Sequence, residues 1–302
     1  MGNILFRLNS SSKIGTGHLM RCLTLAKKYK DCKISFACEN LQGNLNSKIL
    51  QQGYSLEILP DGSSKTLIEV IRKLKIDFLI IDSYEIDYSF EKTIKENCQI
   101  KLLCFDDTYE KHYCDILLNH NICAKKSKYK DLVPSFCELR CGKEYTLIRD
   151  EFYKEKERKK IKKKHLPLRV FIAMGGSDVS NINIKILKVL LKNFSFKIEI
   201  VTTSANANIE ELKSFTKDKN SITLHIDSKE LAKLMGQCDF AIITPSVTAN
   251  EVIFMNLPFV AIKVVDNQQE MYEYMIENNY KALEKFNEDR LIENIKELTN
   301  GR

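Results

Sequence analysis

A histidine that follows two glycines is the first candidate for chemistry in this chain. Gly15 and Gly17 lie between an apolar run at residues 4–8 and a helical pattern that begins near His18. Glycines let the backbone approach a ligand closely, and the start of a helix offers unpaired amides to an anion. A histidine in such a place can exchange a proton near neutral pH. The alternative is a histidine that only satisfies the start of its helix, because G-x-G alone is not the full dinucleotide fingerprint.

A second glycine turn has the same setting in the other half of the chain. Gly175, Gly176 and Ser177 follow an apolar run and precede another helical pattern, about 160 residues after the first turn. Such a turn suits a pyrophosphate group, although a plain tight turn has the same composition. The repetition suggests two nucleotide-binding-type halves.

Two polar clusters follow later apolar runs in the second half. Ser246 and Thr248 open a helical segment, and Glu251 lies in its early turns. An acidic side chain there can accept hydrogen bonds from a ribose diol, or it can merely complement the helix dipole. Asn267 and Gln268 carry amides that both donate and accept, which suits sugar hydroxyls and equally suits the start of a helix.

Short apolar runs that alternate with amphipathic segments must position these clusters. Strands are expected at 4–8, 33–38, 56–59, 78–82, 101–106 and 115–119, and again at 169–174, 196–202, 222–226, 240–244 and 258–264. Runs that are apolar on both faces are typical of buried parallel strands joined by crossover helices. The pattern predicts an α/β protein of two Rossmann-like domains that face each other across a cleft, with ligands beyond the carboxyl ends of the strands.

The composition is that of a soluble folded protein. The chain has 302 residues, of which 44% are hydrophobic and 29% charged, close to the globular average. It contains no apolar run approaching 18 residues and no basic segment before an apolar stretch at the N-terminus. We therefore expect a cytoplasmic protein with no membrane partner.

Most of the net charge lies in one short stretch. Residues 154–165 carry a net charge of +6 out of a total of +7, so the rest of the chain is almost neutral. A solvated connector or the exposed face of a helix explains such a run, and a nucleic-acid-binding strip is the alternative. We expect an N-terminal domain at 1–153, a basic linker at 154–166 and a C-terminal domain at 167–302, with no nucleic-acid partner.

The cysteines and histidines raise the question of a metal. The ten cysteines form no C-x-x-C pair, and we expect them to be reduced and mostly buried. His112, Cys114, His120 and Cys123 are residue types that bind zinc, but their spacing matches no common tetrahedral site. We therefore expect no metal.

The order of these motifs along nearly the whole chain resembles the GT-B fold of MurG-type UDP-sugar enzymes. Within that group the chain is most similar to the UDP-2,4-diacetamido-2,4,6-trideoxy-β-L-altropyranose hydrolase family of pseudaminic acid synthesis. The stretches that carry this similarity are 10–18, Asp82 with Tyr84, 105–107, 115–119, 145–152 and 174–176.

The resemblance implies a role for each candidate residue. His18 corresponds to the general base, which activates a water that attacks the anomeric carbon with inversion, so that UDP and the free sugar are released. The first half of the chain, including the loop of Gly15 and Gly17, then supplies the base and sugar contacts, and the second half binds UDP. By the same matching, Gly176 and Ser177 face the diphosphate, Ile226 lies by the uracil, Ser246 and Thr248 lie near the phosphates, Glu251 holds the ribose, and Tyr84, Asn267 and Gln268 contact the sugar. The resemblance implies no cofactor.

Several alternatives stay open at this point. Asp82, Asp106 and Asp107 lie at the carboxyl ends of predicted strands, and any of them could orient His18. A glycosyltransferase of the same fold would use His18 to deprotonate an acceptor, and a non-catalytic UDP-sugar-binding module would show no turnover. We expect a monomer whose partner is a small UDP-sugar.

Overall fold

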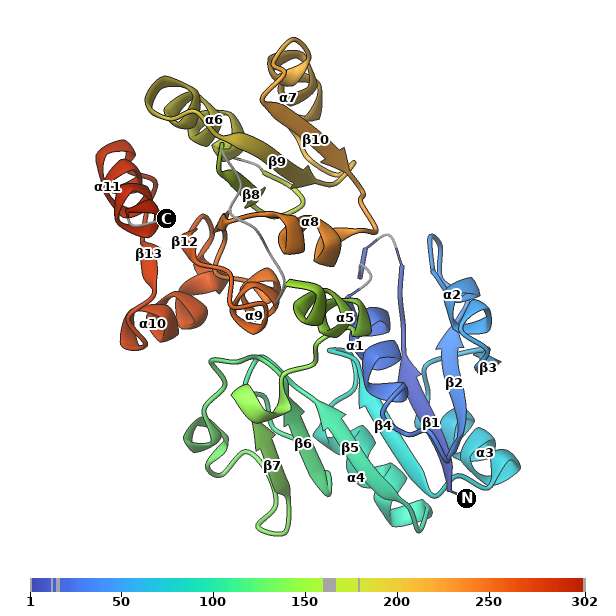
Figure 1. The fold of residues 1–302 in the computed structure, drawn as a ribbon. Coiled ribbons are helices and arrows are strands. Elements are labelled where there is room, and N and C mark those ends of the chain that lie inside the picture. The colour runs from blue at the N-terminus through green and yellow to red at the C-terminus, as the bar shows by residue number, and fades with distance from the viewer. Residues whose placement is uncertain (1, 12, 15–16, 160–166, 179, 301–302) are drawn as a thin grey trace. The chain divides into compact units, whose positions relative to one another are not determined.

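The chain folds into two compact units, Met1–Leu147 and Ile148–Arg302. The computed structural model describes residues 2–11, 13–14, 17–159, 167–178 and 180–300 (Figure 1). Each unit is built on one parallel β-sheet whose strands are joined by helices. The prediction of two Rossmann-like α/β halves is confirmed.

Seven parallel strands form the sheet of the first unit, in the order β3-β2-β1-β4-β5-β6-β7. They are β1 (Asn3–Leu8), β2 (Lys33–Glu39), β3 (Ser55–Leu59), β4 (Phe78–Asp82), β5 (Lys101–Phe105), β6 (Ile116–Asn119) and β7 (Glu138–Cys141). The helices of this unit are α1 (Gly17–Ala26), α2 (Ser47–Gln51), α3 (Ser64–Leu74) and α4 (Tyr88–Asn97), with 3₁₀ turns η1 (Lys126–Tyr129) and η2 (Lys143–Tyr145). The strand order reverses between β1 and β4, which is where ligands bind in doubly wound sheets.

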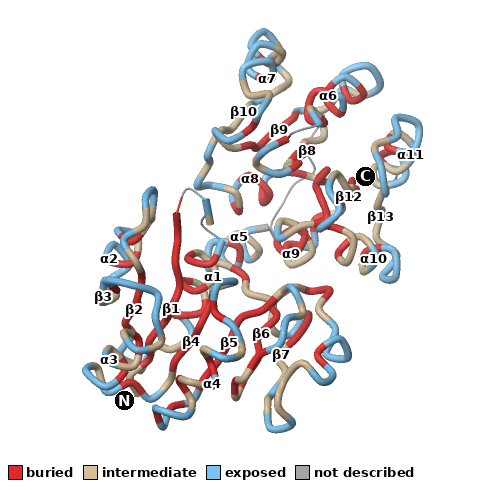
Figure 2. Tube along the Cα trace, turned by 180° about the vertical axis from the view of Figure 1, so that it is seen from behind, coloured by how far each residue is buried: buried red, intermediate tan, exposed pale blue. Residues whose placement is uncertain are grey.

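Apolar side chains cover both faces of this sheet. One core cluster contains Leu5 and Leu79, and the other contains Phe6 and Ile80. Neighbouring residues of a strand point to opposite faces, so the continuous apolar runs fill both sides. Figure 2 shows the result, with buried strands at the centre and exposed positions on helices and loops.

Six parallel strands form the sheet of the second unit, in the order β10-β9-β8-β11-β12-β13. They are β8 (Arg169–Ala173), β9 (Lys197–Thr202), β10 (Ile222–Ile226), β11 (Phe240–Ile243), β12 (Phe259–Ile262) and β13 (Lys281–Leu283). The helices are α5 (Asp150–Lys159), α6 (Ile182–Asn193), α7 (Ile209–Thr216), α8 (Leu231–Gln237), α9 (Val247–Phe254), α10 (Gln269–Glu277) and α11 (Glu288–Thr299), with the 3₁₀ turn η3 (Asp266–Gln268). The reversal again falls beside the first strand, between β8 and β11.

The start of the basic run is a helix of the second unit. In α5 the ring of Phe152 is fully buried, and the ring of Tyr153 packs on Phe254 at 4.6 Å. Glu155 lies so close to Gly236 of α8 that a methyl group there would meet its Cγ at 2.8 Å. The unit boundary therefore falls at Leu147, whereas the sequence places residues up to 153 in the first domain. Residues 160–166 of the predicted linker lie outside the described part of the chain.

Two strands were not predicted from the sequence, β7 and β13. Both are edge strands of three or four residues, and neither is fully buried. Within the described residues, no helix combines the length and apolar composition that a membrane span requires.

Candidate active site

His18 lies at the reversal point of the first sheet. It is the second residue of α1, which follows β1, and it is 6% exposed. Asp82, the last residue of the neighbouring strand β4, is fully buried. His18 Nδ1 lies 2.5 Å from Asp82 Oδ1, although the two residues are 64 positions apart in the sequence. The structure thus brings a candidate base and a carboxylate together at the carboxyl end of the sheet.

This contact determines which nitrogen of His18 is available. Because the ionised carboxylate only accepts hydrogen bonds, Nδ1 carries the hydrogen and donates it to Asp82. In a neutral imidazole Nε2 then holds the lone pair that can take a proton from another molecule. The arrangement matches the histidine–aspartate part of a catalytic triad, in which the aspartate fixes the tautomer and stabilises the imidazolium.

Arg21 holds Asp82 from the same helix, one turn after His18. Its Nε donates to Asp82 Oδ2 and its Nη2 to Oδ1, both at 2.6 Å. Nη2 also lies 3.2 Å from His18 Nδ1, because both nitrogens donate to the same oxygen. Burial raises the pKa of Asp82, but the hydrogen bonds and charge of Arg21, together with the bond from His18, outweigh it and hold that pKa well below its usual range. Asp82 therefore stays ionised although no water reaches it.

Arg21 also links this pair to Tyr84. Its Nη1 donates to Asp107 Oδ2 at 2.8 Å, and the hydroxyl of Tyr84 donates to Asp107 Oδ1 at 2.7 Å. The Tyr84 ring meets the His18 ring edge-on, with 4.7 Å between centroids. Partial burial and the bond to Asp107 raise the pKa of Tyr84 to about 12, so its hydroxyl stays protonated. Tyr84 is 64% exposed, which leaves its ring accessible to a ligand beside His18.

The structure ranks the three carboxylates that the sequence left open. Asp82 contacts His18, and Asp107 contacts Arg21 and Tyr84. Asp106 instead accepts the hydroxyl hydrogen of Tyr129 at 2.6 Å, away from His18. Sequence reasoning missed Arg21, for which the signal was its position three residues after His18 on one helix face.

His120 is a second buried histidine near the same network. It follows β6, is 5% exposed and stacks edge-on with Phe105 at 6.2 Å. Burial lowers its pKa to about 4, and the charge of Arg21 acts in the same direction. His120 is therefore neutral at physiological pH and adds no charge beside Asp82.

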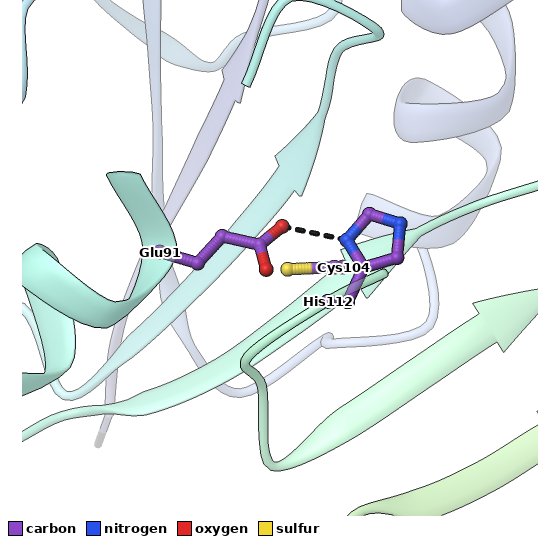
Figure 3. Close-up of side chains that lie close together, drawn as sticks. All are labelled: Glu91, Cys104 and His112. Carbon is purple, nitrogen blue, oxygen red and sulfur yellow. Dashed lines mark hydrogen bonds and ion pairs between the residues drawn. The ribbon is translucent and has the colours of Figure 1, made fainter. Parts of the chain in front are cut away.

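His112, the other histidine among the four residues considered as zinc ligands in the sequence, belongs to a separate cluster. Figure 3 shows His112, Glu91 and Cys104, whose ligand atoms lie within 4.8 Å of one another. His112 Nδ1 lies 2.7 Å from Glu91 Oε1, and Nε2 lies 3.7 Å from Asp106 Oδ1. Burial lowers the pKa of His112, but Asp106 and Glu91 outweigh it and raise that pKa to about 9.

These contacts indicate an ion-pair network. The distance from His112 to Glu91 is that of a hydrogen bond, and each ring nitrogen of His112 lies beside a carboxylate. Cys114 has another partner, since its Sγ lies 3.8 Å from Cys137 Sγ, and all ten cysteines are free thiols. We interpret the cluster as a brace for the segment between β5 and β6.

In the second unit the glycine turn after β8 is shaped by packing. Gly175 has a φ of +88°, which favours glycine, and a Cβ on Gly176 would meet Thr203 Oγ1 at 3.0 Å. Asp178, two residues after Gly176, accepts hydrogen bonds from the amides of Ile182 and Asn183, at 2.8 and 3.3 Å. These first amides of α6 are thus already occupied by a carboxylate. Ser177 is exposed at the tip of the turn.

The helix α9 presents a different arrangement. Ser246 precedes α9, makes no side-chain cap to it, and places its hydroxyl 3.1 Å from that of Thr244. Thr248 is half-buried in the first turn, and Glu251 lies one turn further on, 8% exposed. The guanidinium of Arg149 donates to Glu251 Oε1 at 2.7 Å. The three residues expected at the phosphates and the ribose thus lie close together along the chain, with Ser246 just before α9 and Thr248 and Glu251 on it.

The remaining candidates lie at other strand ends. Ile226 is the last residue of β10 and is half-buried. Asn267 is exposed in η3, whereas Gln268 is buried and its Oε1 accepts the amide hydrogen of Val264 at 2.9 Å. In the first unit Gly17 is exposed at the start of α1, and Gly15 lies outside the described residues. Gln268 is therefore tied to its own loop in this structure.

The fold and these strand ends define a two-domain protein of the GT-B class. The chain superposes on Acinetobacter baumannii MurG with a TM-score of 0.64 and 14% identity, over 99% of this chain and 91% of that one. It superposes on Phytolacca americana UGT2, solved with UDP-2fluoro-glucose and pterostilbene, with a TM-score of 0.67 and 13% identity, over 100% and 91% of the two chains. These likenesses confirm the predicted fold.

The sequence narrows this class to one family. The chain is 42% identical over 283 residues to a UDP-2,4-diacetamido-2,4,6-trideoxy-beta-L-altropyranose hydrolase of Campylobacter jejuni, which covers 94% of this chain and 99% of that protein. No protein-family model matches the chain. The chain belongs to the UDP-2,4-diacetamido-2,4,6-trideoxy-β-L-altropyranose hydrolase family, as the motifs of the sequence predicted.

Proposed function

We propose that this protein hydrolyses UDP-2,4-diacetamido-2,4,6-trideoxy-β-L-altropyranose to UDP and the free 2,4-diacetamido-2,4,6-trideoxy-L-altropyranose. The observation that carries the proposal is the buried pair of His18 and Asp82 at the reversal point of the first sheet. The family relationship supplies the substrate. The pair supplies the one group that such a hydrolysis needs, a base for water.

In the proposed reaction His18 Nε2 accepts a proton from a water molecule. The water oxygen forms a bond to the anomeric carbon while the bond from that carbon to the UDP oxygen breaks, so the configuration inverts. UDP leaves with the electron pair of the broken bond, and the proton on His18 later returns to solvent. Asp82 stabilises the imidazolium in between, at the 2.5 Å contact.

The diphosphate is a good leaving group when oriented donors hold its charge. We assign that role to the start of α9 with Ser246 and Thr248, because the first amides of α6 are bonded to Asp178. Gly176 and Ser177 are assigned to the same diphosphate from the side of the β8 turn. Glu251, one turn along α9, is assigned to the ribose, and Ile226 to the uracil.

The sugar end of the substrate is assigned to the residues around His18. Tyr84 offers an exposed ring against the His18 ring, which suits the apolar face of a deoxy sugar. Gly15, Gly17, Asn267 and Gln268 complete the proposed contacts. Gln268 would have to exchange its bond to Val264 for one to the sugar.

A time course by proton NMR with the UDP-sugar tests the proposal, with EDTA present and no acceptor added. Growth of UDP together with a reducing diacetamido sugar is the expected result, and turnover in EDTA tests the absence of a metal requirement that the resemblance implies. A His18→Leu variant should lose about 10²- to 10⁴-fold in kcat while still binding UDP. His225→Gln is the matched control, because His225 pairs with Glu199 in the second unit.

The same assay separates the alternatives. A glycosyltransferase would turn over only after a sugar or lipid acceptor is added, and a sensor would bind the UDP-sugar without consuming it. Either result would refute the hydrolase. The cytoplasmic location, the monomeric state and the lack of a nucleic-acid partner stay predictions from the sequence.

A further inference from the structure

Arg149 is a charged residue with no role in the proposed reaction. It belongs to the stretch 145–152, which is similar to the hydrolase family, and it directly precedes α5. Its Nη2 donates to Glu251 Oε1 at 2.7 Å and its Nε to the same oxygen at 3.2 Å. Both residues belong to the second unit. Arg149 is therefore fixed directly to the residue that we assign to the ribose.

The guanidinium itself is held in place. Its Nη1 lies 2.9 Å from Glu151 Oε1, and its plane lies over the ring of Phe152, with 5.0 Å to the centroid. Phe152 is fully buried, so it is a rigid support. A guanidinium with two carboxylate partners and an aromatic platform keeps one orientation toward Glu251.

Glu251 needs such a partner because of where it lies. It is 8% exposed on a helix that has no other charged residue. Burial raises the pKa of Glu251, and the charge and hydrogen bonds of Arg149 act against that rise, whereas nearby Glu151 adds to it. A buried carboxylate without a cation tends to take up a proton and lose half of its accepting capacity.

The geometry also divides the two oxygens of Glu251 between different tasks. Both hydrogen bonds from Arg149 end on Oε1. A carboxylate can accept about four hydrogen bonds, so Oε2 retains its lone pairs for donors from a ligand. The two hydroxyls of a ribose are donors of this kind, and a charged acceptor binds them more strongly than a neutral one.

We propose that Arg149 is a positioning residue for nucleotide recognition, which holds Glu251 as an ionised and oriented acceptor for the ribose hydroxyls. The inference rests on the proposed function, because it takes over the assignment of Glu251 to the ribose. A merely structural tie between the start of α5 and α9 is the competing explanation. The two explanations differ in whether Arg149 affects the discrimination between ribose and deoxyribose.

Calorimetric titration of the full chain with UDP and 2′-deoxy-UDP measures that discrimination. Because a hydrogen bond to a charged group is worth about 1.5 to 3 kcal/mol, the parent protein should prefer UDP by roughly tenfold or more at pH 7. In Arg149→Met the preference at pH 7 should fall to about twofold, and it should recover as the pH is raised and Glu251 ionises without the cation. Arg149→Lys should keep an intermediate preference, because lysine retains the positive charge but lacks the paired N–H donors of the planar guanidinium.

Arg158→Met is the matched control, because Arg158 lies on α5, the helix that Arg149 precedes, and its side chain is 76% exposed. It should bind both nucleotides like the parent. Thermal unfolding of each variant shows whether it is folded. If Arg149→Met does not fold, the comparison of Arg149→Lys with the parent still decides the test.

Three outcomes would overturn the inference, each at a different level. If Arg149→Met and Arg149→Lys discriminate like the parent at every pH, Arg149 is only a structural tie. If the parent itself binds UDP and 2′-deoxy-UDP equally, the assignment of Glu251 to the ribose fails, and the inference fails with it. If the parent binds no UDP at all, the proposed function fails first.

Discussion

Replacing Asp82 with asparagine tests the candidate catalytic pair most directly. In the parent protein Asp82 Oδ1 accepts hydrogen bonds from His18 Nδ1 and Arg21 Nη2, and Oδ2 accepts one from Arg21 Nε. Arginine can only donate, so the NH₂ group of an asparagine faces an Arg21 nitrogen in either orientation, and the neutral amide no longer balances the charge of an imidazolium. Where the NH₂ group takes the place of Oδ1, it donates to His18 Nδ1. The hydrogen of the neutral imidazole then lies on Nε2, the atom that must accept the proton of water.

The expected loss follows from the missing carboxylate charge together with this reversal of the tautomer. The same change in a serine-protease triad lowers kcat by about 10⁴-fold, which corresponds to about 5.5 kcal/mol of transition-state free energy. We expect kcat to fall by about 10³- to 10⁴-fold here. The free energy of unfolding should fall by less than the roughly 3 to 5 kcal/mol typical of a broken buried ion pair, because Arg21 keeps its bond to Asp107. UDP affinity should stay within about twofold, because the proposed UDP-binding residues lie in the second unit.

Release of UDP from the UDP-sugar, measured by NMR at saturating substrate, is the assay. A thermal unfolding curve shows whether the variant is folded, and calorimetric titration shows whether it still binds UDP. Asp218→Asn, at an exposed position in the second unit, is the matched control and should leave kcat unchanged. A folded Asp82→Asn enzyme that loses less than tenfold in kcat would refute the idea that Asp82 sets the tautomer of His18.

Two further predictions concern stability and the nucleotide site. The pKa of His112 is raised from 6.5 to about 9, so its contribution to the free energy of unfolding is fully present below pH 6.5 and is lost as the pH rises through 9. The free energy of unfolding, measured with urea, should therefore fall by on the order of 3 kcal/mol between these pH values. In His112→Gln this pH dependence should disappear, and a variant that keeps the pH dependence of the parent would contradict the ion-pair network. In Gly176→Ala the new Cβ must push Thr203 aside, from a contact of 3.0 Å to Oγ1. That variant should lose about 1 to 3 kcal/mol of stability and bind UDP more weakly, and equal UDP affinity in calorimetry would argue against a close approach of the β8 turn to the diphosphate.

The fold could be predicted well because its signals are local. Strands such as Phe78–Asp82 and Phe240–Ile243 are apolar runs with side chains buried on both faces, which is the pattern of central parallel strands. The short edge strand Glu138–Cys141 carries charged residues and escapes this rule, because one side of it faces no neighbour. The start of the basic run was ambiguous for a similar reason, since the buried Phe152 that anchors α5 lies just before the lysines.

The candidate site could be predicted only in part, because its partners come from different strands. The sequence identified His18 and three acids at strand ends, but the spacing along the chain cannot say which acid meets the histidine. The strand order decides this, because β4 lies next to β1 and β5 lies one strand further away. The same distance explains why Asp107 meets the side chains of Arg21 and Tyr84 rather than His18 itself.

Arg21 keeps Asp82 ionised in addition to fixing its orientation. Burial alone raises the pKa of a carboxyl group, and a protonated Asp82 would lose the charge that stabilises an imidazolium. With two bonds from Arg21, Asp82 remains ionised while part of its charge is already balanced before His18 accepts a proton. Asp82 can then stabilise a transient imidazolium at His18, and the neutral His120 nearby adds no further charge. One turn of α1 therefore supplies both the proposed base, His18, and the cation that keeps Asp82 ionised.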